Sequence, residues 1–159
     1  MSDPKLIINF VAIGLCGLST IFCILALCLN TWHNDGLFTF GLWKVCAIGK
    51  CGPWTIVPGK LQAVRAFAFL GLFLIIGAAV SSCLHAFVMK TNNTLINISL
   101  GSSIGSGLCM GIAFIVFIRG EEITLGAGIY MCIAAWLFGW IVGLLNGRLV
   151  VLTRRAPNN

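Results

Sequence analysis

The chain has 159 residues, of which 59% are hydrophobic and only 9% are charged. Soluble domains carry about 25% charged residues, so this composition excludes a water-soluble globular domain and indicates an integral membrane protein. The formal net charge is +6. The basic residues are scattered singly, except for the adjacent pair Arg154 and Arg155. This spacing argues against a nucleic-acid partner.

Four uncharged apolar runs follow one another along the chain, at residues 6–29, 66–89, 95–118 and 123–147. Each is at least as long as the ~20 residues that a helix needs to cross a bilayer. Backbone N–H and C=O groups in lipid must be paired within their own segment, so we expect four helices that contact the lipid bilayer. The short links between the last three runs predict one antiparallel four-helix transmembrane bundle in a single domain, residues 1–159.

The first loop, residues 30–65, is the long connection between the first two runs. Lys and Arg are equally divided between the two sides of the membrane, so they do not orient the chain. Six of the eight cysteines lie inside apolar runs, where a cysteine most often packs as a small hydrophobe. Cys46 and Cys51 are the exceptions. A disulfide between them persists only in an oxidising compartment, so it would place the loop outside the cell and both termini in the cytosol.

The same loop has the composition of β-strands. Residues 37–46 mix aromatic and β-branched side chains, and residues 51–57 continue this pattern after a turn at residues 47–50. Such a hairpin places Cys46 opposite Cys51, within the Cα separation that a disulfide requires. We therefore expect a mainly α integral membrane protein with a small extracellular antiparallel β-sheet in its first loop. The Cys46–Cys51 bond would fix the register of that sheet.

The motif residues of the loop are Trp32, Gly41, Leu42, Trp43, Cys46 and Cys51. Their pattern, placed between the first and second of four spans, resembles the signature of the claudin superfamily. That superfamily includes the peripheral myelin protein, the epithelial membrane proteins, the lens fibre membrane intrinsic protein and the channel γ-subunits. The segment Leu-Gln-Ala-Val-Arg-Ala at residues 61–66 is similar to the family's entry into the second span. The short third loop and the cysteine spacing resemble the myelin and lens subgroup most.

Two features depart from that family pattern. The first loop contains no glycosylation sequon, which the myelin and epithelial proteins often carry there. The last residues, 156–159, lack the hydrophobic end that claudins offer to PDZ scaffolds. The second departure speaks against a junctional role that depends on a PDZ scaffold.

The tryptophans of the loop and Arg65 each allow more than one interpretation. Trp32, Trp43 and Trp54 form a contact surface, pack the loop onto the bundle, or belong to an ordinary aromatic belt at the membrane boundary. For Trp32 the resemblance favours packing. Arg65 either anchors the second span by snorkelling or, as the resemblance implies, pairs with loop carbonyls or with Asp35. The latter would lock the sheet onto the helices.

Small residues form stripes in the third and fourth spans. Such stripes let helix backbones approach closely, either inside one bundle or between two copies, and packing inside the bundle is the favoured interpretation. The glycines concerned are Gly101, Gly105, Gly107, Gly111, Gly139, Gly143 and Gly147.

The sequence predicts no enzyme, cofactor or metal site, because His33 and His85 fall on opposite membrane faces and no ligand spacing occurs. We predict a structural protein of the plasma membrane. Its extracellular loop would organise cell–cell contacts or membrane apposition by binding other membrane proteins in cis or trans, including a second copy. Apolar residues at the loop tip are the contact candidates. These are Leu37, Phe38, Phe40 and Ile48.

Two alternatives to this function stay open. The first is an auxiliary, γ-like subunit that docks sideways on an ion channel or receptor, as one branch of the family implies. The second is a paracellular pore. Asp35 is the only acidic residue of the loop, against Lys44, Lys50 and Lys60, so such a pore should favour anions. Copurification from native membrane would separate the first alternative from self-association.

Overall fold

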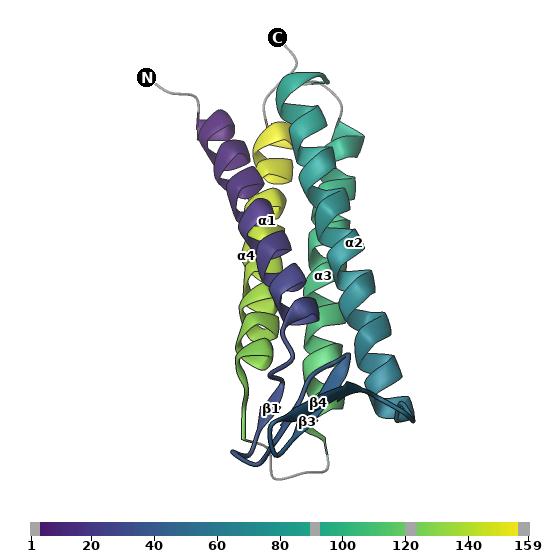
Figure 1. The fold of residues 1–159 in the computed structure, drawn as a ribbon. Coiled ribbons are helices and arrows are strands. Elements are labelled where there is room, and N and C mark those ends of the chain that lie inside the picture. Colours follow the sequence, from purple (N-terminus) through teal and green to yellow (C-terminus); the bar gives the residue numbers. More distant parts are fainter. Residues whose placement is uncertain (1–3, 90–92, 120–123, 156–159) are drawn as a thin grey trace.

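A computed structural model describes residues 4–89, 93–119 and 124–155 of the chain, without the Arg155 side chain. Its four long helices are α1 (Pro4–Cys28), α2 (Gly59–Phe87), α3 (Asn93–Ile118) and α4 (Ala127–Arg155). All four are long and apolar enough to cross a membrane. They run side by side, and the start of α1 and the end of α4 lie at the same end of the bundle (Figure 1).

The helices pack as a ring in which α1 contacts α2 and α4, while α3 contacts the same two helices. The side chains buried between them include both small and large groups. Ala78 and Ala135 are among the small ones, and Ile75, Met110 and Ile129 are among the large ones. The small side chains let helix backbones approach closely, and the large ones fill the space that remains.

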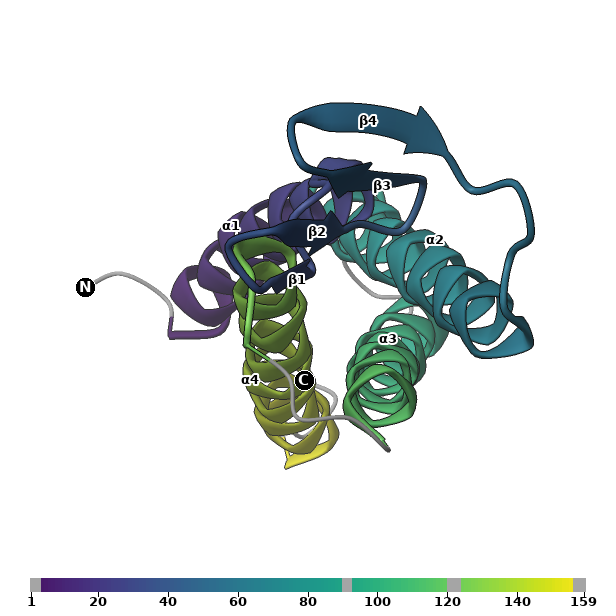
Figure 2. The same ribbon diagram turned by 60° about the horizontal axis from the view of Figure 1, so that its bottom comes forward.

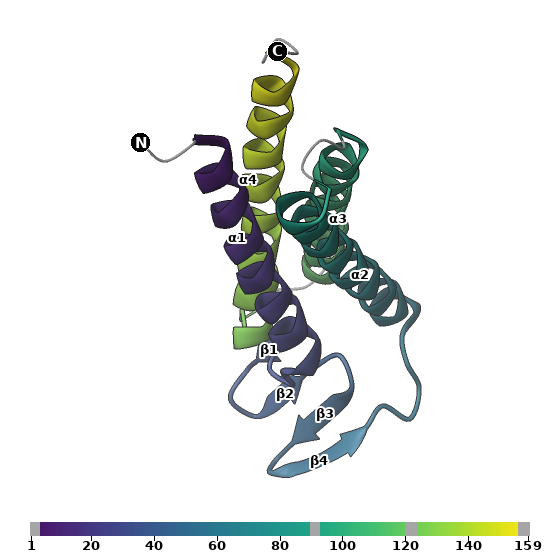
Figure 3. The same cartoon turned by 90° about the horizontal axis from the view of Figure 1, so that it is seen from above.

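A four-stranded antiparallel sheet covers the end of the bundle away from the termini. The strands are β1 (His33–Asn34), β2 (Phe38–Phe40), β3 (Lys44–Ala47) and β4 (Lys50–Pro53), in that spatial order. In Figures 2 and 3, β1 lies beside the start of α4 and β4 lies outermost. All four strands fall between α1 and α2, so the sheet is built entirely from the predicted first loop.

The helix boundaries differ from those expected from hydropathy. The second helix begins at Gly59, immediately after Pro58, instead of at residue 66. The fourth begins at Ala127 instead of residue 123 and continues to Arg155 instead of ending at residue 147. Apolar runs mark the part of a helix that suits hydrocarbon. A helix itself continues through polar residues until its hydrogen-bonding pattern ends, and proline is favoured at its start.

Candidate contact surface on the disulfide-closed sheet

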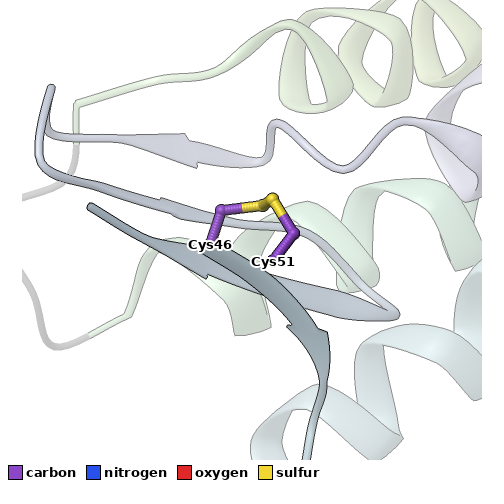
Figure 4. Close-up of a disulfide and its surroundings, with 2 residues drawn as sticks. All are labelled: Cys46 and Cys51. Carbon is purple, nitrogen blue, oxygen red and sulfur yellow. A yellow bond between two sulfur atoms is a disulfide. The ribbon is translucent and has the colours of Figure 1, made fainter. Parts of the chain in front are cut away.

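The disulfide joins neighbouring strands. Cys46 of β3 pairs directly with Cys51 of β4, and their sulfurs are bonded with the Cα atoms 4.0 Å apart (Figure 4). The predicted bond is therefore confirmed. The loop that it closes is short, so its stabilisation by chain entropy is about 2 kcal/mol. Its position, one residue pair from the turn, ties β3 and β4 into a fixed register.

The turn between these strands is tighter than expected. Ala47 pairs with Lys50, so only Ile48 and Gly49 form the turn, and not the four residues 47–50. Both central residues have positive φ, 48° and 75°, as a type I′ turn requires. Glycine adopts such a φ freely, but a β-branched residue does so against steric resistance. Ile48 is the only non-glycine residue with positive φ in the described part of the chain.

Ile48 and Leu37 form the apolar tip of the sheet. The Ile48 N–H donates to the Leu37 carbonyl at 3.2 Å, which brings the turn beside the start of β2. Their side chains are 82% and 68% exposed, and Phe38 next to them is 42% exposed. Phe40, the fourth contact candidate, is partly buried, because its ring packs against His33 and Trp54. Phe40 is therefore less accessible to a partner than Leu37, Phe38 and Ile48.

Trp32 packs the sheet onto the bundle. Its side chain is fully buried, and its ring lies 5.0 Å from that of Phe117 in α3, centroid to centroid. The indole Nε1–H donates to the Ala26 carbonyl at 2.7 Å. Ala26 lies in the last turn of α1, where carbonyls have no partner within the helix. Trp32 thus caps α1 from a buried position. Of the interpretations considered for Trp32, packing of the loop onto the bundle is confirmed, and Trp32 is not part of an exposed contact surface.

Trp43 makes the equivalent contact one residue further along α1. Its Nε1–H donates to the Leu27 carbonyl at 2.7 Å. The two tryptophans of the motif therefore satisfy two consecutive carbonyls at the C-terminus of one helix. A third tryptophan, Trp54, donates to the Gly41 carbonyl within the loop at 3.2 Å. None of the three indole N–H groups is left for a partner.

Arg65 links the sheet to α2. Its Nε–H donates to the Leu42 carbonyl at 2.8 Å, and its Nη2 donates to the same oxygen. The guanidinium also lies 4.6 Å from the centroid of the Trp43 ring, a cation–π distance. Of the two partners considered for Arg65, the structure thus shows the loop carbonyl, and no contact with Asp35 occurs in the described residues. The Leu42 side chain is fully buried beneath this contact.

Gly41 is required by close approach of two backbones. A Cβ at this position would overlap the backbone of Asn30, with the carbonyl carbon only 2.7 Å away. Residue 30 lies just beyond α1, so Gly41 lets the turn between β2 and β3 press against the end of that helix. The Gly-Leu-Trp motif therefore has a distinct physical role at each of its positions: close approach, burial and capping.

The connection between α3 and α4 also holds the sheet, which the sequence did not indicate. His33 of β1 forms a bridge with Leu125, and the Asn34 N–H donates to the Thr124 carbonyl at 3.3 Å. On the same side, the Gly126 N–H donates to the Trp32 carbonyl at 3.0 Å. Thus the edge of the sheet formed by β1 is covered. The other edge, β4, has no strand beyond it among the described residues.

The predicted glycine stripes lie mostly at contacts inside the bundle. A Cβ at Gly139 would meet the Gly107 backbone at 3.0 Å, and one at Gly111 would meet the Trp136 ring at 2.9 Å. Gly143 and Gly105 similarly face Ile104 and Leu74. By contrast, Gly147 makes only ordinary contact, and Gly101 has nothing within 4 Å. Five of the seven glycines, Gly107 among them, thus lie where a side chain would crowd a neighbouring helix. Gly147 is in looser contact with Leu100 of α3, and Gly101 makes no such contact.

A buried polar network joins three helices and was not recognised from the sequence. Ser99 of α3 accepts a hydrogen bond from Asn146 of α4 at 2.9 Å and donates to the Ala78 carbonyl at 3.0 Å. Ser82 of α2 lies 2.7 Å from the same hydroxyl. With Ser82 donating, every lone pair and proton of the Ser99 hydroxyl is used. Such a network specifies one arrangement of the helices.

Two concave regions stand out among the described residues. A groove of about 620 Å³ runs along α4, where Gly143, Gly147 and Arg148 line it together with apolar side chains of α1, α3 and α4. A second pocket of about 340 Å³ lies under the sheet. Within the described residues, no group of three or more His, Cys, Asp or Glu side chains is placed to hold a metal ion.

Comparison with known proteins adds no relative. No protein-family model matches the chain, and a search of curated protein sequences also found no match.

Proposed function

We propose that the chain is a non-enzymatic, claudin-like protein that spans the plasma membrane four times and organises contacts between cells or apposed membranes. Its binding element is the tip of the disulfide-closed sheet. The proposal is supported by the four apolar helices, by the bonded Cys46–Cys51 pair and by the motif that seats the sheet. Its partner is a membrane protein in cis or trans, including a second copy of the chain.

Ile48 is the observation that carries this proposal. A non-glycine residue with left-handed backbone costs about 1–2 kcal/mol, and Asn or Gly would fit the turn better. Nor does the Ile48 side chain recover this cost by burial, because it is 82% exposed. An isoleucine that is both strained and exposed is explained if its side chain is buried against a partner. Strain of this kind concentrates at functional sites.

The proposed orientation places the sheet outside the cell and both termini in the cytosol. A disulfide persists in oxidising compartments, and the sheet lies at the opposite end of the bundle from the termini. A C-terminal epitope tag should therefore resist protease on intact cells, while the exposed Lys50 amine reacts with an impermeant reagent. Digestion of the tag on intact cells would overturn the orientation and, with it, an adhesive role for the sheet.

The contact function is tested by separating stability from binding. Ile48→Asn should relieve the turn and raise the thermal stability of the purified protein, because Asn tolerates positive φ. The same change should abolish the aggregation of non-adherent cells that express the protein. Ile56→Asn is the matched control. Ile56 is 84% exposed but follows β4, beyond the end of that strand opposite to the turn.

The result is decisive in either direction. Aggregation that is lost with Ile48→Asn and kept with Ile56→Asn, at equal surface expression, supports a contact through the tip. Equal aggregation of both variants and the wild type contradicts it. Mixing expressing with non-expressing cells then distinguishes a second copy from a different partner on the opposing cell.

A second candidate function is that of an auxiliary subunit of an ion channel or receptor. The groove along α4 favours it, because a concave face lined mostly by apolar side chains suits a helix of another membrane protein. Copurification with a pore-forming protein, lost when Gly147→Leu fills the groove, would support this function. Self-association alone, unaffected by Gly147→Leu, would support the contact function instead.

A further inference from the structure

The groove along α4 covers only part of the length of the bundle. Its volume is about 620 Å³, and α4 lines it from Trp140 to Leu152. Ile8 of α1 and two residues of α3, Leu100 and Ile104, complete its apolar walls. Between residues 140 and 152 the helix advances by 12 steps of about 1.5 Å, so the groove is about 18 Å long. It lies toward the end of the bundle where α1 starts and α4 ends, away from the sheet.

Arg148 lies at the depth of the lipid headgroups if the four helices span a bilayer. It is the first charged residue of α4 and follows Ala127, where the helix starts, by 21 residues. At about 1.5 Å a residue this distance is about 32 Å, close to the ~30 Å thickness of a hydrocarbon core. Trp140 precedes Arg148 by eight residues, which places it about 12 Å deeper, near the bilayer midplane. The groove therefore spans the hydrocarbon of one leaflet, from the headgroups to the midplane.

The described part of the chain offers no counter-charge to Arg148, whose side chain is exposed. Asp35 is the only acidic residue in that part, and it lies between β1 and β2, at the opposite end of the bundle. Lys5 adds a second positive charge at the same end as Arg148. It lies on the same face of α1 as the groove residue Ile8, one turn closer to the start of the helix. The mouth of this apolar groove is thus cationic, and an anionic group complements it.

We propose that the groove binds a phospholipid with a net anionic headgroup. One acyl chain lies against Leu100, Ile104 and Trp140, and the headgroup phosphate accepts hydrogen bonds from the Arg148 guanidinium. A helix of another protein would cross both leaflets, whereas a groove confined to one leaflet fits an acyl chain. Basic pockets between transmembrane helices bind anionic headgroups in the cytosolic leaflet, which is the leaflet that the proposed orientation gives to Arg148. This binding rests on the four spans of the proposed function and not on the contact through the tip of the sheet.

The test measures which lipid gathers beside Trp140. The full-length protein, with 5-fluorotryptophan at its five tryptophan positions, is placed in phosphatidylcholine nanodiscs. A small fraction of the lipid carries a nitroxide in the distal part of one acyl chain, on either phosphatidylserine or phosphatidylcholine. Labelled phosphatidylserine should broaden the ¹⁹F signal of Trp140, assigned from Trp140→Phe, about fivefold more than labelled phosphatidylcholine at the same fraction. Trp136, one turn earlier on α4 and outside the groove, should show no such preference.

Two variants and one control complete this test. Arg148→Gln removes the charge at the mouth and should make the two labelled lipids broaden Trp140 equally. Arg119→Gln is the matched control, because Arg119 is also exposed but follows α3 at the other end of the bundle, so the fivefold preference should remain. Gly147→Leu fills the groove and should reduce the broadening of Trp140 by both lipids. Unshifted ¹⁹F signals of the other tryptophans confirm that each variant is folded.

Equal broadening of Trp140 by the two lipids in the wild type overturns the proposal, because unselective contact with bulk lipid gives that result. A preference that survives Arg148→Gln also overturns it, since the headgroup is then held elsewhere. Broadening of Trp136 without Trp140 has the same consequence, because protein and not lipid then fills the groove. These three outcomes leave the proposed function intact. If neither lipid broadens any tryptophan signal, the four spans of the proposed function fail together with the lipid site.

Discussion

Arg65→Met should release the sheet from the helices without unfolding them. The change removes two hydrogen bonds from a guanidinium to the Leu42 carbonyl and the stacking of Arg65 on Trp43. Charge-assisted hydrogen bonds contribute about 1.5–3 kcal/mol, and a cation–π contact contributes about 0.5–1 kcal/mol. Because both N–H groups donate to one carbonyl oxygen, we count them as a single charge-assisted hydrogen bond. At the lower limit this bond and the cation–π contact sum to about 2 kcal/mol, or a roughly thirtyfold larger population of sheet that has opened from the bundle.

Hydrogen exchange measures that opening directly. In nanodiscs, amides of residues 38–53 should exchange roughly thirtyfold faster in Arg65→Met, while amides of the four helices stay protected. Arg65→Lys should fall between the two proteins, because an ammonium keeps the charge but not the planar fork. Lys44→Met, which removes an exposed charge from β3, is the control. Wild-type exchange rates in Arg65→Met would show that Arg65 is only a membrane anchor, and the argument for a locked sheet would fail.

Two further changes test the bundle and the disulfide. Gly139→Leu should destabilise the bundle by about 1–3 kcal/mol through overpacking and so lower its midpoint of thermal unfolding, because the new Cβ meets backbone. Gly101→Leu should leave the midpoint unchanged, and equal effects of the two changes would contradict the packing role. Cys46→Ser, Cys51→Ser and the double variant should each lose the same stability of the sheet, about 2 kcal/mol, since all three break one bond. A double variant clearly less stable than both singles, by the same exchange measurement, would show that each cysteine acts separately.

The features that hydropathy and spacing encode were predictable from the sequence. Four helices and the Cys46–Cys51 bond follow from run length and from two cysteines across a turn. The ends of α2 and α4 did not follow, because helices continue beyond the residues that suit hydrocarbon. The two-residue turn was missed for a related reason. Type I′ turns are recognised by Asn-Gly or Gly-Gly, and Ile48-Gly49 carries only half of that signal.

Contacts between distant segments were the least predictable. A strand as short as β1 has no periodicity, so its pairing with Leu125 leaves no trace in the sequence. Asn146 and Ser99 look like isolated polar residues within apolar runs, and only the packed bundle brings them together. Phe40 looks like any aromatic residue of an exposed strand until Trp54 and His33 are placed around it.

The capping of α1 connects the tryptophans of the loop motif to the exposed tip. Trp32 and Trp43 satisfy consecutive carbonyls in the last turn of α1, which have no partner within the helix. Trp32 directly precedes β1, and Trp43 lies in the turn between β2 and β3. The same two hydrogen bonds therefore stabilise both the end of α1 and the sheet. A turn built on such a rigid base can hold Ile48 at a disfavoured φ, since relaxation of the turn would have to disturb β3, β4 and their disulfide. The strained φ at Ile48 is therefore held by the β3–β4 pairing and by the Cys46–Cys51 disulfide next to the turn.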